Sequence, residues 1–189
     1  MKKVFKIEDK NIINSVFDKA EYGTLALSYN DEPYAVAVNF VRIGESIYFH
    51  GALNNKKMKI LAKNPKVSFS VVESYSIIDS YFSSHDGLAC PATHFFKSVS
   101  IDGVAEVIEN QEEKALMFEA MMKKLQPSGG YKSFSDEAYN KALKTTAVVK
   151  IVPSTISCKF KFGQHLDTER FEMIVKHLQE RGSEVDLAT

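Results

Sequence analysis

Two adjacent lysines that follow a predicted strand form the best candidate for a binding site. Residues 46–51 alternate as a short strand, a turn of small residues follows at Gly51 and Ala52, and Lys56 and Lys57 lie at the start of a predicted helix. Helix N-termini carry unpaired N–H groups and positive potential, and lysines add full charges. The arrangement suits a phosphate, although adjacent lysines at a helix start also occur as an ordinary solvated face.

A second group of reactive side chains lies in a long segment of loop character, residues 79–93. Cys90 and His94, with His85 nearby, have the residue types of a metal site or a nucleophilic pair. The spacing matches no well-known metal site and only one cysteine contributes, so we predict no metal here. The alternative is a small buried thiol beside a loop histidine. Cys158 is expected in the core.

The elements that must position these residues follow from hydrophobic periodicity. Strand Tyr34–Val41 is apolar on both faces and is expected to be central. Gly103 is expected to mark a bulge or bend, and the last eight residues are expected to be frayed. Helices are expected at 8–20, 55–63, 110–126, 135–144 and 167–181. Strands are expected at 24–29, 34–41, 46–51, 67–71, 95–108 and 147–162, the last interrupted by Pro153.

Two of these helices have predicted apolar faces. The face of helix 110–126 is expected to be Ala115, Leu116, Phe118, Met122 and Leu125, with the methionines as adaptable packing. Helix 167–181 is expected to turn Phe171, Ile174, Val175 and Leu178 inward. Hairpin turns between the strands favour antiparallel pairing, so the sequence predicts an α+β domain around a small barrel or curled sheet.

Composition excludes several classes of protein. The chain has 189 residues, 24 Lys plus Arg and 24 Asp plus Glu, which is ordinary for one globular domain and argues against a nucleic-acid binder or a polybasic membrane anchor. Two cysteines are too few for a disulfide framework. Charges at residues 6, 8, 9 and 10 interrupt any export signal, and no uncharged run approaches the ~18 residues of a membrane helix. We therefore expect a cytoplasmic protein that does not enter a membrane.

Three segments together resemble one known family. They are Tyr48-Phe49-His50-Gly51-Ala52 with Lys57 and Asn64-Pro65-Lys66-Val67, the stretch from Phe96 to Ala105, and Lys159-Phe160-Lys161-Phe162-Gly163-Gln164. In this order they are similar to the flavin-binding split-barrel proteins, which include the pyridoxamine 5′-phosphate oxidases and the nitroimidazole-resistance (Nim-type) proteins. The resemblance covers roughly residues 8–166 and implies a six-stranded antiparallel split β-barrel with flanking helices.

The resemblance also implies a cofactor and its contacts. It implies a homodimer with flavin mononucleotide (FMN) at each subunit interface and a small-molecule substrate. Strand Tyr34–Asn39 would run beside the flavin ring, and Lys56 and Lys57 would hold the phosphate. The cofactor-binding residues implied in this way are Tyr34, Ala35, Val36, Asn39, Phe49, His50, Lys56, Lys57, Lys97 and Ser98, the last two from either the same or the second subunit.

The Nim-type branch fits better than the oxidase branch. The chain has three arginines (Arg42, Arg170 and Arg181) and no tryptophan, and it lacks the Arg- and Trp-rich C-terminal substrate motif of the oxidases. His50 is the best candidate for a catalytic proton donor because an unperturbed histidine titrates near ~6.5. It could equally be a strand-end histidine that bonds a backbone carbonyl.

The resulting hypothesis is an FMN-dependent oxidoreductase that passes electrons from a reduced nicotinamide or similar donor to a small organic, for example nitro-aromatic, acceptor. The alternatives are a non-catalytic flavin-binding or flavin-sensing protein, and a haem-binding split barrel with His50, His85 or His94 as axial ligand. A ligand-free interaction domain is the fourth. We expect residues 1–166 to form the split-barrel domain and residues 167–189 to form a C-terminal helix and tail.

Overall fold

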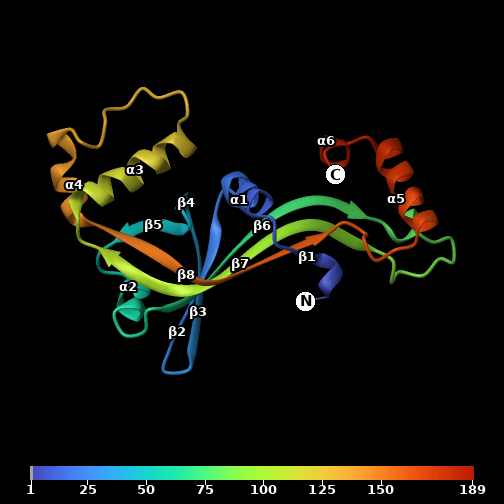
Figure 1. Cartoon of the computed structure of the whole chain (residues 1–189), viewed down its shortest axis with the longest axis horizontal. Helices are drawn as coiled ribbons and strands as arrows, with labels where there is room; N and C mark the ends of the chain where they lie inside the picture. Colours follow the sequence, from blue (N-terminus) through green and yellow to red (C-terminus); the bar gives the residue numbers. More distant parts are fainter. Residues whose placement is uncertain (1) are drawn as a thin grey trace. The chain divides into compact units, whose positions relative to one another are not determined.

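The computed structural model describes residues 2–189 and is an α+β fold built on one antiparallel, non-closed sheet (Figure 1). The strands follow the order β3-β2-β6-β7-β8-β5-β4, and β1 pairs with β8. Their bounds are β1 (Lys6–Ile7), β2 (Gly23–Tyr29), β3 (Glu32–Val38), β4 (Phe40–Ile43), β5 (Ser46–Ala52), β6 (Lys66–Ile78), β7 (Thr93–Ile108) and β8 (Thr146–Lys161).

The helices flank this sheet. They are α1 (Lys10–Lys19), α2 (Lys56–Leu61), α3 (Gln111–Leu125), α4 (Asn140–Thr145), α5 (Thr168–Arg181) and α6 (Glu184–Leu187). Short 3₁₀ turns are η1 (Lys3–Phe5), η2 (Ser80–Phe82) and η3 (Glu137–Tyr139). The split-barrel class predicted from the sequence is confirmed. The sheet has eight strands because the predicted strand 34–41 divides at Asn39 into β3 and β4, and because the two-residue β1 is added.

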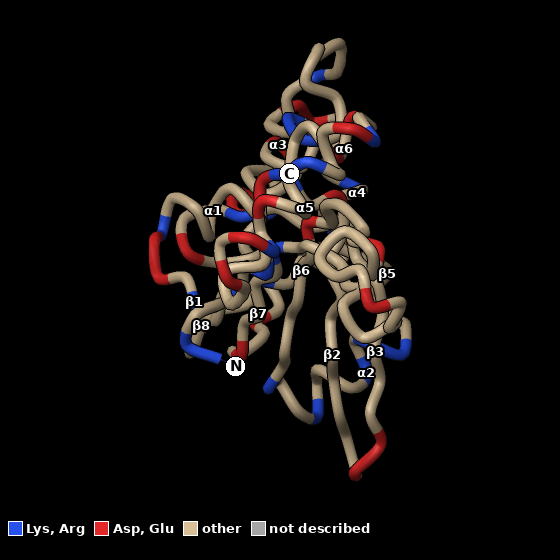
Figure 2. The backbone as a smooth tube through the Cα atoms, turned by 90° about the vertical axis from the view of Figure 1, so that its right-hand side faces the viewer, with Lys and Arg blue, Asp and Glu red and all other residues tan. Residues whose placement is uncertain are grey.

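The chain forms two compact units, which are described separately. The first unit consists of residues 2–16, 72–99 and 157–189, and the second of residues 17–71 and 100–156. Strands β6, β7 and β8 each contribute residues to both units. Lys and Arg are interspersed with Asp and Glu along the backbone, as the balanced composition predicts (Figure 2). Within residues 2–189 no helix is both long and apolar enough to cross a bilayer.

The core of the second unit joins the sheet to α1 and α3. Phe40 lies edge-on to both Phe17 and Phe69, with ring centroids 6.3 and 5.1 Å apart. Met117 and Met121 of α3 pack into a cluster with residues of β4, β5 and β8: Val41, Tyr48 and Val148. These contacts hold β4, β5 and β8 against α3, and the two candidate lysines follow β5 in the chain.

Two predictions for the second unit are wrong. β3 is not central: it lies at one end of the strand order, and its side chains are mostly exposed or half-buried. The inward face of α3 is not the predicted one, because Leu116 and Leu125 are 65% and 55% exposed. Lys114, Met117 and Met121 are buried instead, and the Lys114 ammonium is satisfied by the carbonyl oxygens of Leu143 and Thr146, each 3.1 Å away.

Gly103 allows a close approach between strands β7 and β8. β7 runs unbroken through it, and a Cβ at this position would collide with the Val152 carbonyl oxygen of β8. Pro153 likewise lies inside the continuous strand β8. The predicted break at Pro153 is therefore absent.

The core of the first unit lies between α5 and the turn η2. Its buried cluster is Ile78, Phe82, Phe95, Ile174 and Leu178. Of the four residues predicted to point inward from α5, Phe171 and Val175 are instead 39% and 37% exposed.

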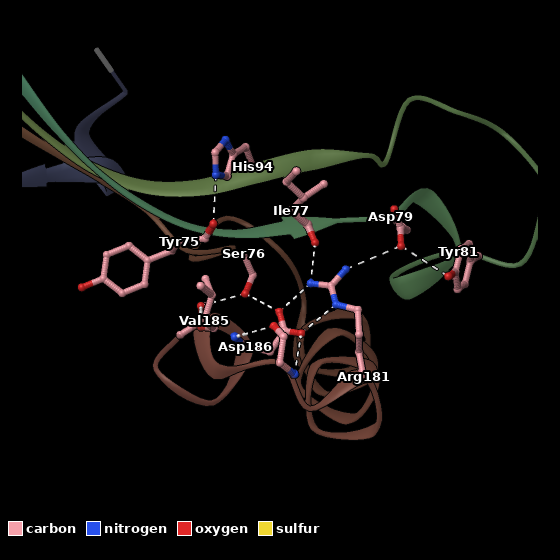
Figure 3. Close-up of polar contacts among 11 residues, drawn as sticks. Tyr75, Ser76, Ile77, Asp79, Tyr81, His94, Arg181, Val185 and Asp186 are labelled. Carbon is pink, nitrogen blue, oxygen red and sulfur yellow. Dashed lines mark hydrogen bonds and ion pairs between the residues drawn. The ribbon is translucent and has the colours of Figure 1, made fainter.

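The C-terminus is ordered by a buried carboxylate, contrary to the prediction of a frayed tail (Figure 3). Asp186 of α6 accepts hydrogen bonds from Ser76 Oγ at 2.5 Å and from Arg181 Nε at 2.7 Å. Ser183 and Asp186 also form a capping box. The Arg181 guanidinium, first among several donors, holds the pKa of Asp186 well below its usual range. The segment is thus fixed by polar contacts that hydrophobic periodicity does not reveal.

Candidate functional site

The turn between β5 and α2 is held by Asn55. Its Oδ1 accepts a hydrogen bond from the Met58 amide at 3.0 Å, and its Nδ2 donates to the Ala52 carbonyl at 2.7 Å. Asn55 therefore caps α2 and ties it to the end of β5. This side chain, which sequence reasoning did not single out, determines where Lys56 and Lys57 begin the helix.

The two lysines direct their ammonium groups to different neighbours. Lys56 Nζ lies 4.6 Å from the ring centroid of Tyr34 on β3, and Lys57 Nζ lies 5.9 Å from that of Phe49 on β5. A Cβ at Gly51 would stand only 2.9 Å from Lys57 Nζ, so a glycine gives Lys57 its room. Within residues 2–189 no carboxylate forms an ion pair with Lys56 or Lys57, and the two charges are available to an anion.

His50 lies beside this positive charge. Its ring is 5.2 Å from that of Phe118, and its side chain keeps an exposed face. Partial burial against protein atoms lowers the pKa of His50 below the ordinary 6.5, and the nearby Lys57 ammonium lowers it further. The imidazole is therefore mainly neutral at pH 7. A neutral ring can accept or donate a hydrogen bond without competing with the lysines for an anion.

β3 brings a row of small or half-buried side chains to the same region as Lys56. Tyr34 and Val36 are half-buried, Ala35 is exposed, and Asn39 is exposed at the break between β3 and β4. Phe49 differs from these, because its ring is completely buried and belongs to the core. The structure thus places Tyr34 and Phe49 next to the lysines, but only Tyr34 is partly accessible to solvent there.

Lys97 and Ser98 belong to the first unit and not to the group around Lys56. Lys97 Nζ donates to the Tyr75 hydroxyl at 2.6 Å and lies 4.0 Å from a Glu73 oxygen. It also lies 5.0 Å from the ring centroid of Phe160 and 5.7 Å from that of Phe162. Burial, and then the hydrogen bond to Glu73, raise the pKa of Tyr75. The sequence pattern predicts strands 95–108 and 147–162 but not the grouping of Tyr75, Phe160 and Phe162 around Lys97.

A surface hollow of about 510 Å³ in the second unit contains none of the predicted residues. Strands β2, β6, β7 and β8 line it, with Lys66 and Asp102 as its charged side chains. Asp102 accepts hydrogen bonds from Ser68 and from Thr155. Because Ser68 and Asp102 lie on neighbouring strands, only the strand register brings them together.

His94 lies on β7 beside β6, and the two cysteines differ in exposure. His94 Nε2 lies 2.9 Å from the Tyr75 carbonyl oxygen (Figure 3). It also lies 2.9 Å from Ser74 Oγ. Cys90 is exposed, which corrects the expectation of a buried thiol, whereas Cys158 is buried as predicted. Burial raises the pKa of Cys158 to about 11. Across residues 2–189 no group of three or more His, Cys, Asp or Glu side chains could hold a metal ion.

Solved structures with this fold are similar over most of their length. One is a candidate 5-nitroimidazole antibiotic resistance protein from Bacteroides thetaiotaomicron (21% identity, 82% of this chain and 85% of that chain, TM-score 0.67). Others are the flavocytochrome Anf3 from Azotobacter vinelandii (22%, 89% and 74%, 0.72) and an FAD- and heme-binding protein from Mycobacterium smegmatis (18%, 82% and 73%, 0.68). No curated protein sequence matches the chain.

The fold is that of the split-barrel class. The profile of the pyridoxamine 5′-phosphate oxidase family matches residues 9–160, which include β2 to β7, α2, α3 and nearly all of β8. The chain belongs to this family.

Proposed function

We propose that the chain is an FMN-dependent oxidoreductase of the Nim-like type that reduces a small organic acceptor, for example a nitro-aromatic compound. The observation that carries the proposal is the pair of cations at the start of α2. Lys56 and Lys57 follow the strand and turn that resemble the family's cofactor motif, and neither is paired with a carboxylate of residues 2–189.

The residues around the lysines fit a flavin phosphate. Gly51 leaves the space beside Lys57 Nζ that a side chain would fill, and Asn55 fixes the turn that carries both lysines. Lysine is a common phosphate ligand as a point charge, and two of them provide twofold positive charge for a phosphate dianion. We assign the phosphate to Lys56 and Lys57. Exposed Ala35 on β3 has no side chain large enough to keep a flat ring away from that strand.

Bound FMN would supply the electron and hydride chemistry. The protein's part is to bind the cofactor, orient it and hold the acceptor. His50 is our candidate for a contact to the acceptor because its ring retains an exposed face beside Lys57. With its lowered pKa the ring is mainly neutral at pH 7, and its capacity to donate a proton as imidazolium grows only as the pH falls below 6.5.

We propose further that the active form is a homodimer with FMN between its subunits. Two features support it. β3 ends the strand order, so one of its edges pairs with no strand of residues 2–189. β7 and β8 also expose four β-branched apolar side chains in the second unit, namely Val104, Val107, Val152 and Ile156. Light scattering coupled to size-exclusion chromatography tests the dimer directly.

Turnover separates the proposal from a storage or sensing role. The purified protein is reconstituted with FMN, mixed with NADH or NADPH without oxygen, and given a nitro-aromatic acceptor. Repeated oxidation of the nicotinamide that depends on acceptor supports the oxidoreductase. If the protein retains FMN but shows no turnover, also with dithionite as the electron source, the result supports a non-catalytic flavin-binding protein instead of an oxidoreductase.

A haem-binding role is the second candidate, supported by the similarity to a flavocytochrome and to an FAD- and heme-binding protein. Its test is a haemin titration. The haem-binding role would be favoured if one of the two variants, His50→Gln or His94→Gln, lost the Soret shift while the other variant retained it.

A further inference from the structure

A second pocket lies entirely within the first unit, between α5 and the segment that leads into β7. Its volume is about 450 Å³, which is within the ~300–1,000 Å³ of ordinary small-molecule sites. In Figure 1, α5 runs beside the loop between η2 and β7 that forms one wall. None of the residues discussed for the flavin phosphate lines it.

The floor of this pocket is apolar and preformed. Phe95 and Ile174 are 3% and 1% exposed and belong to the core of the first unit, and Leu166 packs against the same cluster. Gly163 adopts a φ of +78°, a conformation that favours glycine, and turns the chain tightly at this wall. The pocket therefore offers a fixed apolar surface to the body of a ligand.

Two anchored cations line the pocket. Arg170 donates from Nε to the Ser83 carbonyl oxygen at 3.0 Å, while both of its terminal Nη atoms lack a hydrogen-bond partner among residues 2–189. Lys161 donates to the Thr93 hydroxyl and to no carboxylate of the described chain. An arginine fixed through Nε still presents the fork of N–H groups that matches a carboxylate, and its fixation lowers the entropy lost on binding.

Two carboxylates and one histidine lie near these cations. Asp167 is the one carboxylate among the lining residues, and its Oδ1 already caps α5 through the Arg170 amide at 2.9 Å. Burial and then the positive charges of Lys2, Lys161 and Arg170 lower the pKa of His165, so the ring adds no further charge at pH 7. Asp86 lies in an adjoining hollow that also borders Arg170; the Leu88 amide and the Ser84 hydroxyl lower the pKa of Asp86, and the Arg170 charge lowers it further.

We propose that this pocket binds a small organic carboxylate, its anionic head paired with Arg170 and Lys161 and its apolar body against Phe95, Leu166 and Ile174. The site has its own floor and its own pair of cations. The expected ligand has a planar, negatively charged carboxylate head and an apolar body small enough for a volume of about 450 Å³.

Cys90 provides the readout for a test. It lines the pocket and is exposed, whereas the other cysteine, Cys158, is buried. A ligand in the pocket should therefore slow alkylation of Cys90 by iodoacetamide, followed by mass spectrometry. The probes are benzoate, its neutral analogue benzamide, and inorganic phosphate. The readout requires no flavin, so its result is independent of the proposed FMN site.

Saturating benzoate should slow the alkylation of Cys90 at least about threefold, as steric cover of a pocket wall requires, and benzamide should not. Arg170→Gln and Lys161→Gln should each remove the protection. Lys176→Gln is the matched control, because Lys176 lies on α5, is exposed and pairs with Glu180. In that variant the protection should remain. Circular dichroism establishes that each variant is folded.

A second comparison tests the charge itself. The measured quantity is the rate of Cys90 alkylation by anionic iodoacetate divided by the rate with neutral iodoacetamide. This ratio should be about two- to fivefold higher in the wild type than in Arg170→Gln, as expected for a partly solvated charge. Unchanged ratios in folded Arg170→Gln would overturn the proposal. So would equal protection by benzamide, equal protection by inorganic phosphate, or no protection by benzoate.

Discussion

Replacing the buried carboxylate of Asp186 should loosen the C-terminus and destabilise the first unit. Asp186→Asn keeps the size of the side chain but removes its charge and turns one acceptor into a donor that faces Arg181. The wild-type carboxylate accepts from Ser76 Oγ, from Arg181 Nε and from Arg181 Nη2, at 2.5, 2.7 and 2.5 Å. Only part of this set can form again with an amide.

The expected size follows from the burial of each partner. Breaking a buried ion pair costs about 3–5 kcal/mol. The Asp186 side chain is 1% exposed but that of Arg181 is 34% exposed, so water recovers part of the loss. We expect the free energy of unfolding to fall by about 2–3 kcal/mol at pH 7. With a urea slope of about 2 kcal/mol per molar, the midpoint should fall by about 1 M.

The effect should depend on pH in a defined direction. The folded-state pKa of Asp186 lies below its unfolded value, so its contribution is present above about pH 4 and is lost as the pH falls toward the folded pKa. The difference between wild type and Asp186→Asn should therefore shrink between pH 7 and pH 3. Glu184→Gln, an exposed change on the same helix, is the control. Equal urea midpoints for the two variants at pH 7 would refute the reasoning.

Three other predictions concern the second unit. Lys57→Gln should raise the pKa of His50, followed by NMR titration of its ring, because the Lys57 ammonium disfavours the imidazolium; an unchanged pKa would contradict the assigned contact. Gly51→Ala should weaken FMN binding in equilibrium dialysis, because its Cβ would stand 2.9 Å from Lys57 Nζ and displace that amine. Gly103→Ala should lower the free energy of unfolding by about 1–3 kcal/mol or prevent folding, because β8 has no room for a methyl group beside Val152. A urea midpoint equal to that of the wild type would exclude the close contact at Gly103.

The elements around the candidate site could be predicted because local patterns determine them. The alternation at residues 46–51 and the stop at Asn64-Pro65 place β5 and α2 correctly. The turn predicted at Gly51 and Ala52 is wrong, because both residues still belong to β5 and pair with β8. Apolar residues on both faces of the predicted strand 34–41 favour a place at the centre of the sheet. In the structure it divides at Asn39, and its first part is an edge strand. Periodicity reports which side chains are apolar and not which neighbour covers them.

Contacts between distant residues explain the other differences. Asp186 meets Ser76, which is 110 residues away in the chain, so no local signal could predict an ordered C-terminus. Lys97 meets Tyr75 and Phe160 only through the pairing of long strands. On α3, Lys114 replaces a predicted apolar residue because its stem packs inward while its ammonium reaches two carbonyl oxygens.

The assignment of the phosphate to Lys56 and Lys57 is tested most directly by FMN affinity, measured by equilibrium dialysis. The test variant is Lys56→Gln/Lys57→Gln. The matched control is Lys59→Gln/Lys63→Gln, which removes the same charge at exposed positions in and just after α2. Each charged hydrogen bond contributes about 1.5–3 kcal/mol, so the test variant should bind FMN at least about 100-fold more weakly than wild type. Equal FMN affinity in the two variants, or no FMN binding by the wild type, would contradict the account.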